Sequence, residues 1–319
     1  MGRYIVRRLA LVVPTLGGIT ILVFVAMRVL PGDPVAMIAA EGQGTYALRP
    51  DELQKARATL GLDRPYHVQY LAWIGDVLRG DFGRSFWRGE PIRDLIVRRG
   101  PITAQIALMA VVLSWIVGVP VGLASAMWRR SPADYLARSV VTTFLAVPSF
   151  WVGLVIVLVG VLMFTWRPPL TIVYFWHDPW GNLQLTLGPA IATGAGLAAV
   201  MARITRSCVL EALEDDYVRT ARAKGLGESL VVWRHVLKNA LLPIITVSGL
   251  ALGGLLGGSV AVERAFGVPG LGTALVQALT ERDWMMIQNL VLLYGLIFTL
   301  INLVVDVSYG LLDPRVRYR

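Results

Sequence analysis

The fold is decided by long apolar runs, the first of which occupies residues 9–30 and reads LALVVPTLGGITILVFVAMRVL. A helix needs about 20 mostly apolar residues, each adding about 1.5 Å, to cross the hydrocarbon core of a bilayer. Five further runs come close to that length or exceed it, at 102–127, 140–166, 187–204, 241–262 and 287–312. The sequence therefore predicts an all-α polytopic membrane protein with six transmembrane helices.

The composition of the whole chain agrees with this fold class. Hydrophobic residues make up 55% of the chain and charged residues 16%, whereas a soluble domain usually holds about 25% charged residues. The net charge of +9 would also suit a nucleic-acid-binding protein, but in a membrane protein the position of the basic residues matters more than their sum. We therefore expect membrane lipid around the chain and no nucleic acid as a partner.

The basic residues indicate how the spans are oriented. They gather in the amino-terminal segment, in the second and fourth loops and in the tail. Among them are Arg3, Arg7, Arg8, Arg129, Arg130, Arg315 and the seven arginines and lysines between positions 203 and 238. Because basic loops are retained on the cytoplasmic side, we expect both termini to be cytoplasmic. The first run is too long for a secretory signal and lacks a small-residue cleavage pattern, so we expect it to be retained as a span.

The segment between the first two spans is long enough for a role of its own on the outer side. Pro50-Asp51-Glu52 predicts the start of a helix that ends at Gly61, and Pro91 predicts a third short helix with Leu95 and Ile96 on the membrane surface. Between them, an amphipathic helix is expected after Pro65, with one face formed by Tyr66, Tyr70, Trp73, Ile74 and Val77. The segment is either a helical cap that packs on the spans or a docking surface for an external partner.

No residue pattern indicates catalysis within this chain. A P-loop needs Gly-Lys followed by Ser or Thr, but the three lysines follow Gln54, Ala223 and Leu237. One cysteine and three histidines do not suggest a metal site. An ion-coupled secondary transporter would usually carry several ionisable residues at mid-membrane; Arg28 and Asp306 are the nearest, and both lie toward the end of a span. A secondary transporter and a structural or biogenesis subunit nevertheless stay open as alternatives at this point.

The fifth span carries a glycine strip, with Gly249, Gly253 and Gly257 at every fourth position. Such a strip lets another helix approach closely, or it gives a transport pathway a smooth wall.

The residues after this span cannot continue as a helix, because they contain a proline and several glycines. Non-helical backbone at membrane depth is tolerated only where protein or water covers it. We therefore predict a partly inserted outer hairpin over the mouth of a pathway, formed by Phe266, Gly267, Pro269, Gly270 and Gly272.

The fourth loop predicts two short helices that meet at Gly225. On the first, Tyr217, Thr220 and Ala221 share one face at helical spacing, and basic residues surround that face. This periodicity favours a compact knob that docks to another protein over a solvated charged loop.

At this point the chain resembles a known family. Its fourth loop is similar to the coupling loop of binding-protein-dependent ABC importer permeases. The similarity lies in Asp216-Tyr217-Val218-Arg219-Thr220-Ala221-Arg222-Ala223-Lys224-Gly225-Leu226, followed by Leu242-Pro243. Three further motifs resemble those of the dipeptide and oligopeptide branch, and most of all those of the first of its two permeases. They are Pro31-Gly32-Asp33-Pro34, Val268-Pro269-Gly270-Leu271-Gly272 and Asp313-Pro314-Arg315. The general loop opens with Glu-Ala-Ala, where this chain has Arg219-Thr220-Ala221.

The resemblance implies the type I ABC importer permease fold in a bacterial or archaeal cytoplasmic membrane. It implies a heterodimer with a second permease, two P-loop ATPase subunits that hold the ATP and Mg²⁺, and an external binding protein that delivers di- or oligopeptides. This chain would hold no cofactor and catalyse no reaction. It would be coupled to an ATPase by Asp216, Tyr217 and Arg219–Leu226. Its parts would be 1–30, a stub and the first span; 31–100, an extracytoplasmic segment; and 101–319, a five-helix core with the coupling loop at 204–240.

Overall fold

The computed structural model describes residues 2–29 and 62–312, and their regular structure is helical apart from one isolated bridge between Arg84 and Pro91. The Pro31–Pro34 motif, the helix predicted from Pro50 to Gly61 and the Asp313-Pro314-Arg315 motif lie outside the described residues. Five helices are long and apolar enough to cross a membrane, and a bent pair makes six if it counts as one span. The structure thus confirms an all-helical chain with several membrane spans.

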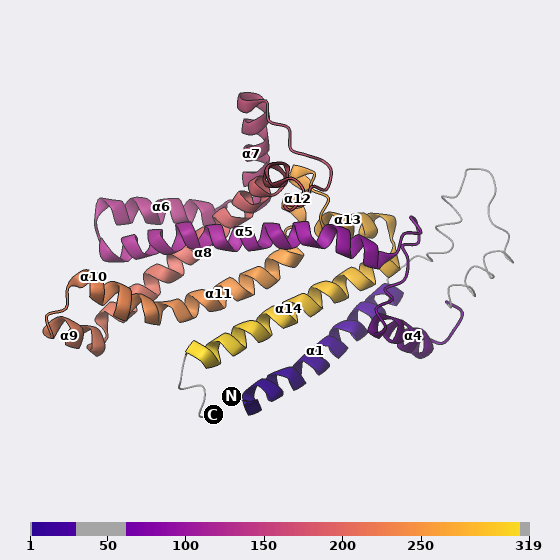
Figure 1. Cartoon of the computed structure of the whole chain (residues 1–319), viewed down its shortest axis with the longest axis horizontal. Coiled ribbons are helices and arrows are strands. Elements are labelled where there is room, and N and C mark those ends of the chain that lie inside the picture. Colours follow the sequence, from indigo (N-terminus) through magenta and orange to yellow (C-terminus); the bar gives the residue numbers. More distant parts are fainter. Residues whose placement is uncertain (1, 30–61, 313–319) are drawn as a thin grey trace.

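The five long helices lie side by side and run in roughly the same direction (Figure 1). They are α1 (Gly2–Val29), α5 (Ile92–Met127), α8 (Pro179–Glu214), α11 (Leu237–Gly258) and α14 (Trp284–Leu312). One end of this group of helices holds the amino terminus of α1, the last turns of α5, α8 and α14, and the start of α11 (Figure 1). This arrangement places the amino-terminal segment and the second and fourth loops, which are rich in basic residues, together at one end of the spans.

The third predicted span differs from a single straight helix. It consists of α6 (Pro132–Ala146) and α7 (Ser149–Phe164), which meet at an angle of 98°. Val147 between them has an extended backbone, with φ −85° and ψ 124°, because the ring of a following proline disfavours the helical conformation. Pro148 therefore breaks the span, and α7 leaves the layer of long helices (Figure 1).

The short helix predicted at Pro91 is wrong, because it continues into the second span as the 36-residue helix α5. Pro101 lies inside this helix and removes one backbone hydrogen bond, but such a loss is tolerated where neighbouring elements cover the helix. Leu95 is only 1% exposed and belongs to a core with α13 (Leu271–Glu281) and α14. The apolar side chain that suggested a membrane-surface helix is therefore buried in protein.

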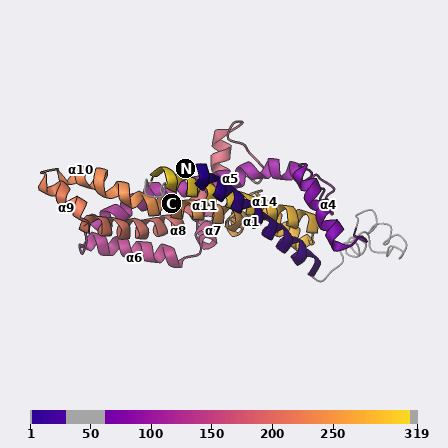
Figure 2. The ribbon, with the colours of Figure 1, turned by 90° about the horizontal axis from the view of Figure 1, so that it is seen from below.

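The outer segment packs on the spans wherever it is described. α4 (Tyr66–Leu78) places Trp73, Tyr70 and Ile74 against Phe24 of α1 and Leu292 of α14. The indole nitrogen of Trp73 also donates to Asn289 Oδ1 over 3.2 Å. Tyr66, predicted on the same face, is exposed instead. These contacts support the helical cap for the described part of the segment, and Figure 2 shows α4 and the α9–α10 region at opposite extremes of the described chain.

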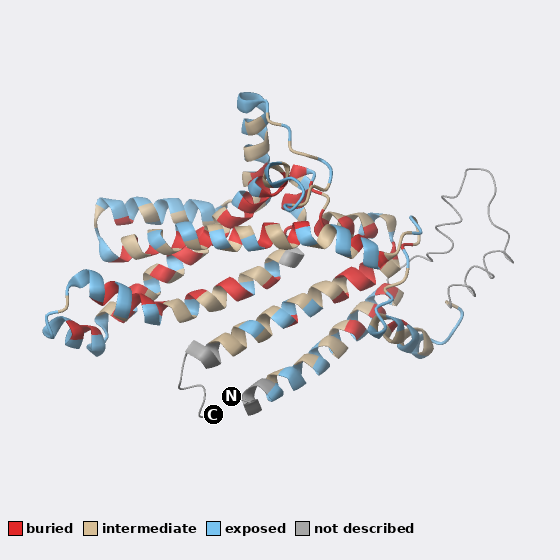
Figure 3. Cartoon of the chain, viewed as in Figure 1, coloured by how far each residue is buried: buried red, intermediate tan, exposed pale blue. Residues whose placement is uncertain are grey.

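One ion pair joins the first and last spans. Arg8 Nη1 lies 2.8 Å from Asp306 Oδ2, so this acidic residue near a span end is paired with a base. α1 and α14 otherwise present many apolar side chains to the outside, and buried residues concentrate where α5 meets α8 (Figure 3).

α5 and α8 approach each other closely at glycines that were not singled out from the sequence. A β-carbon at Gly118 would lie 2.5 Å from the carbonyl oxygen of Ala198, and one at Gly122 would collide with the carbonyl oxygen of Ala202. Gly194 of α8 meets the backbone of Ala110 in the same way. Small residues four apart allow such backbone contact, so Gly118 and Gly122 fix the distance between these two helices.

We expect Gly122→Ala to destabilise the protein by roughly 1–3 kcal/mol, the range for overpacking a filled site. The obstacle is a backbone carbonyl, which cannot rotate away as a side chain can. Thermal unfolding in detergent measures the effect. Gly254→Ala is the matched control, because a β-carbon there meets nothing within 4 Å; equal unfolding midpoints for the two variants would contradict this account.

Candidate functional site

The predicted knob is present at the end of the spans that carries the basic segments. It consists of α9 (Asp216–Ala223), α10 (Glu228–Leu230) and a π-helical turn, η1 (Val231–Val236), which leads directly into α11. Asp215 alone separates α9 from α8. The knob therefore has only this short connection to α8 on one side and a continuous helical connection to α11 on the other.

Gly225 ends α9 in the left-handed conformation, with φ +77°. Its amide donates to the carbonyl of Arg222 over 2.9 Å, and the amide of Leu226 donates to the carbonyl of Ala221 over 3.4 Å. This double pattern is a Schellman cap, in which the residue after the glycine contacts the last helical turn. Leu226 accordingly packs against the small core that contains Ala221, so the predicted stop at Gly225 is correct.

The buried face of α9 differs from the predicted one. Val218 and Ala221 point into a core with Val209 of α8 and Val231 and Val236 of η1, whereas Tyr217 and Thr220 are exposed. The prediction grouped Ala221 with the two exposed residues, because their spacing alone does not show which side faces the spans. The bidentate ion pair from Arg222 to Glu228, with N–O distances of 3.0 and 2.6 Å, closes the knob across the turn.

The outward surface of the knob holds most of the residues predicted to couple. Asp216, Tyr217, Arg219, Thr220, Ala223, Lys224 and Gly225 are exposed. These polar and basic side chains stand on a base of buried apolar residues. Such a surface is suited to docking against another protein, since it is exposed, carries charged side chains and lies at one extreme of the described chain (Figure 2). Within the residues that the structure describes, no three His, Cys, Asp or Glu side chains are arranged to hold a metal ion.

A buried carboxylate fixes the helices behind the knob. Asp134 of α6 is 1% exposed and accepts hydrogen bonds from Arg206 Nε and Nη2, both at 3.1 Å. Ser125 Oγ of α5 donates to it over 2.6 Å and the amide of Arg130 over 3.0 Å. One side chain thus joins α5, α6 and α8 at the end where the knob begins. The sequence reading did not single out Asp134, because its partner Arg206 is 72 residues away.

The predicted outer hairpin is a short turn between α12 (Val260–Phe266) and α13, wrapped around a second buried carboxylate. Glu263 is fully buried and accepts from Thr103 Oγ1 at 2.8 Å and from the amide of Thr273 at 2.9 Å. Burial raises the pKa of this carboxyl, and the hydrogen bonds oppose that shift. Gly270 lies against the carboxyl group, where a β-carbon would collide with it.

The other members of the hairpin are placed by the same turn. Gly267 has φ +68° and ends α12, and Gly272 lies in the first turn of α13 beside Glu263. Phe266 is buried where Gly153 of α7 and Gly188 of α8 leave room for its ring. The hairpin is therefore covered by protein on the side of α7 and α8. Whether it lies over a pathway stays a prediction.

The glycine strip of α11 faces the last span. A β-carbon at Gly249 would collide with Val305, and one at Gly253 would lie 2.6 Å from the ring of Phe298, both on α14. Gly257 lies outside the residues whose side-chain surroundings the structure describes. The two described glycines are thus used for packing between α11 and α14.

Comparison with known proteins gives the same assignment for both halves of the chain. Residues 118–318 match the family described as binding-protein-dependent transport system inner membrane component, and residues 1–107 match its amino-terminal counterpart. The chain is 39% identical, over its full length and that of the relative, to the glutathione transport system permease protein GsiC of Salmonella typhimurium (strain LT2). It is 38% identical, again over both full lengths, to GsiC of Escherichia coli (strain K12).

Two solved structures share the fold. The MetNI methionine ABC transporter in inward-facing conformations is similar with a TM-score of 0.57, at 18% identity over 70% of this chain and 99% of that one. An amino acid ABC transporter solved with histidines gives a TM-score of 0.52, at 17% identity over 67% of this chain and 92% of that one.

Proposed function

We propose that this chain imports peptides together with a second, homologous permease. The chain belongs to the family of binding-protein-dependent transport system inner membrane components and is a permease component of an ABC importer. An external binding protein delivers the peptide, and two separate ATPase subunits, which hold ATP and Mg²⁺, drive alternating access. The chain itself is a multi-pass protein of the cytoplasmic membrane.

The observation that carries this proposal is the knob. Its exposed face offers a docking surface to an ATPase, while its buried face is continuous with the core that joins α8 and α11. When ATP closes the ATPase subunits, a force on α9 would tilt α8 and α11 together, because Asp215 alone separates α9 from α8 and η1 leads directly into α11. Since basic loops are retained in the cytoplasm, the knob and both termini face that side, where ATP is available.

The relatives support the proposed substrate class. GsiC belongs, by its name, to a glutathione transport system, and glutathione is itself a short peptide. We therefore expect di- or oligopeptides, glutathione among them, and we expect the external binding protein to make most of the selection.

Co-purification tests the assembly. The tagged chain is recovered from detergent-solubilised native membranes, and the accompanying proteins are identified by mass spectrometry. We expect a second permease and one or two P-loop ATPases. Recovery of this chain alone, still able to move solute into liposomes without ATP, would replace the proposal with an ion-coupled secondary transporter.

A further inference from the structure

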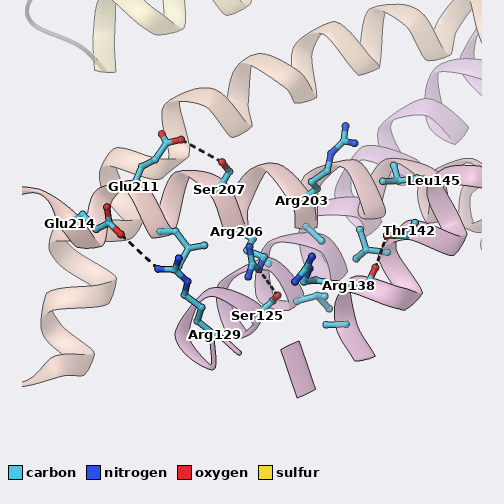
Figure 4. A pocket seen from close by; sticks show the side chains of 16 residues that line it. Ser125, Arg129, Arg138, Thr142, Leu145, Arg203, Arg206, Ser207, Glu211 and Glu214 are labelled. Carbon is cyan, nitrogen blue, oxygen red and sulfur yellow. Dashed lines mark hydrogen bonds and ion pairs between the residues drawn. The ribbon is translucent and has the colours of Figure 1, made fainter. Parts of the chain in front are cut away.

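A basic cavity lies between α5, α6 and α8, beside the buried Asp134 (Figure 4). Its volume is about 550 Å³, and four arginines line it: Arg129, Arg138, Arg203 and Arg206. Glu211 and Glu214 line it at the end near the knob, whereas Leu145 lies at the opposite end. Arg138 and Arg203 lie between these two ends in Figure 4.

Two of the four arginines are already used by carboxylates. Arg206 pairs with Asp134 at 3.1 Å, and Arg129 lies 3.7 Å from Glu214. Glu211 accepts a hydrogen bond from Ser207 over 3.4 Å. In the described part of the chain, no carboxylate forms an ion pair with Arg138 or Arg203. Both arginines are exposed, and the Arg138 guanidinium lies over the ring of Tyr135, 5.8 Å from its centroid. Their long side chains can turn toward an anion in the cavity, since an exposed contact of this kind contributes only about 0.5–1 kcal/mol.

The cavity continues into an apolar groove along the same three helices. This groove has a volume of about 260 Å³ and shares Val121, Val141 and Ala202 with the basic cavity. Its lining consists of aliphatic and aromatic side chains and glycines. Val117, Phe144 and Ile191, which are 51%, 39% and 42% exposed, leave it open to the surroundings.

The length of the groove matches one leaflet of a bilayer. From Arg203 to Ile191, α8 advances twelve residues, or about 18 Å, while half of the hydrocarbon core is roughly 15 Å thick. The basic end lies at the same end of the spans as the knob, where the phosphates of the inner leaflet would be. Basic pockets between transmembrane helices on this side are suited to anionic lipid headgroups.

We propose that this groove binds one anionic phospholipid, with its phosphate at Arg138 and Arg203 and an acyl chain along α8 from Ala202 to Ile191. Charge complementarity selects an anionic headgroup, and the apolar lining selects a hydrocarbon chain. An extended peptide would instead need partners for its backbone N–H and C=O groups, and the apolar part of the groove offers no polar side chain to supply them. The lipid would hold α6 against α8 beside the knob.

Lipid retention measured by native mass spectrometry tests the proposal. The full-length chain, purified in detergent with the subunits that accompany it, is titrated with phosphatidylglycerol and separately with phosphatidylcholine. We expect selective retention of phosphatidylglycerol, weakened about five-fold by Arg138→Gln and about thirty-fold by Arg138→Gln combined with Arg203→Gln, since each basic residue near an anionic surface contributes roughly a factor of five. Arg93→Gln combined with Arg167→Gln removes the same charge from exposed positions outside the groove and the knob and should leave retention unchanged.

Four results would overturn the proposal. Equal retention of the two lipids would show that the arginines do not select an anionic headgroup, and unchanged retention in the double groove variant would place the lipid elsewhere. Glycerol phosphate that competes as well as the intact lipid would reduce the site to a soluble-anion site. Finally, phosphatidylglycerol with a photoreactive acyl chain should label Ala195 or Val141. A crosslink from these positions to the second permease, without lipid labelling, would show that the groove is an interface between permeases.

Discussion

Gly225→Val is expected to lower ATP-dependent uptake by at least about ten-fold while the subunits still assemble and still hydrolyse ATP. Gly225 has φ +77°, a conformation that costs a side-chain-bearing residue roughly 1–3 kcal/mol and a β-branched one most of all. About 2 kcal/mol shifts a two-state equilibrium by roughly thirty-fold, so the Schellman cap would open and α9 would lose its fixed angle to α10. Uptake and ATP hydrolysis are measured side by side in proteoliposomes.

Gly227→Val is the matched control for this experiment. Gly227 lies two residues further along, has φ −61°, and a β-carbon there meets nothing within 4 Å. A β-carbon at Gly225 also meets nothing within 4 Å, so the two positions differ in backbone conformation and not in space. Normal coupling in Gly225→Val, or an equal loss in both variants, would contradict the role proposed for the knob. Recovery of the full complex with uncoupled ATP hydrolysis would leave the assembly intact and locate the defect in the turn.

Asp134→Ala is expected to destabilise the protein by roughly 3–5 kcal/mol, the cost of removing one partner of a buried ion pair. The Arg206 guanidinium would lose both of its hydrogen bonds to the carboxylate, and the hydroxyl of Ser125 and the amide of Arg130 would lose their acceptor. Thermal unfolding of the detergent-solubilised protein measures the effect, and α6 should separate from α5 and α8 first.

Two comparisons separate this effect from the loss of any acidic residue. Asp76→Ala breaks an exposed pair with Arg79, whose atoms are 3.7 Å apart, and should cost no more than about 0.5 kcal/mol. Asp134→Ala combined with Arg206→Met removes the uncompensated charge, so the double variant should be more stable than Asp134→Ala alone. A double variant that is less stable than Asp134→Ala would show that the ion pair is not the cause.

Several features could be predicted because they depend on short stretches of sequence. The spans follow from hydropathy and length, and the end of α9 follows from Gly225, whose left-handed conformation is local to the turn. The close contact of α5 with α8 also had a signal in the sequence, the small residues Gly118 and Gly122 four positions apart. The break at Pro148 likewise lay in the sequence as a proline inside an apolar run.

The sequence by itself determined that this chain is helical, crosses the membrane several times and ends one short helix at Gly225, because hydropathy, helix length and glycine conformation are properties of neighbouring residues. Only the tertiary structure decided which face of α9 is buried, which helix meets Gly249 and Gly253, and that Asp134 and Glu263 become buried acceptors. In a membrane, lipid is as apolar as the protein core, so periodicity does not distinguish a lipid-facing side from a packed one. Carboxylates that pair with donors 72 and 160 residues away are set by how the helices pack, and no local pattern contains that information.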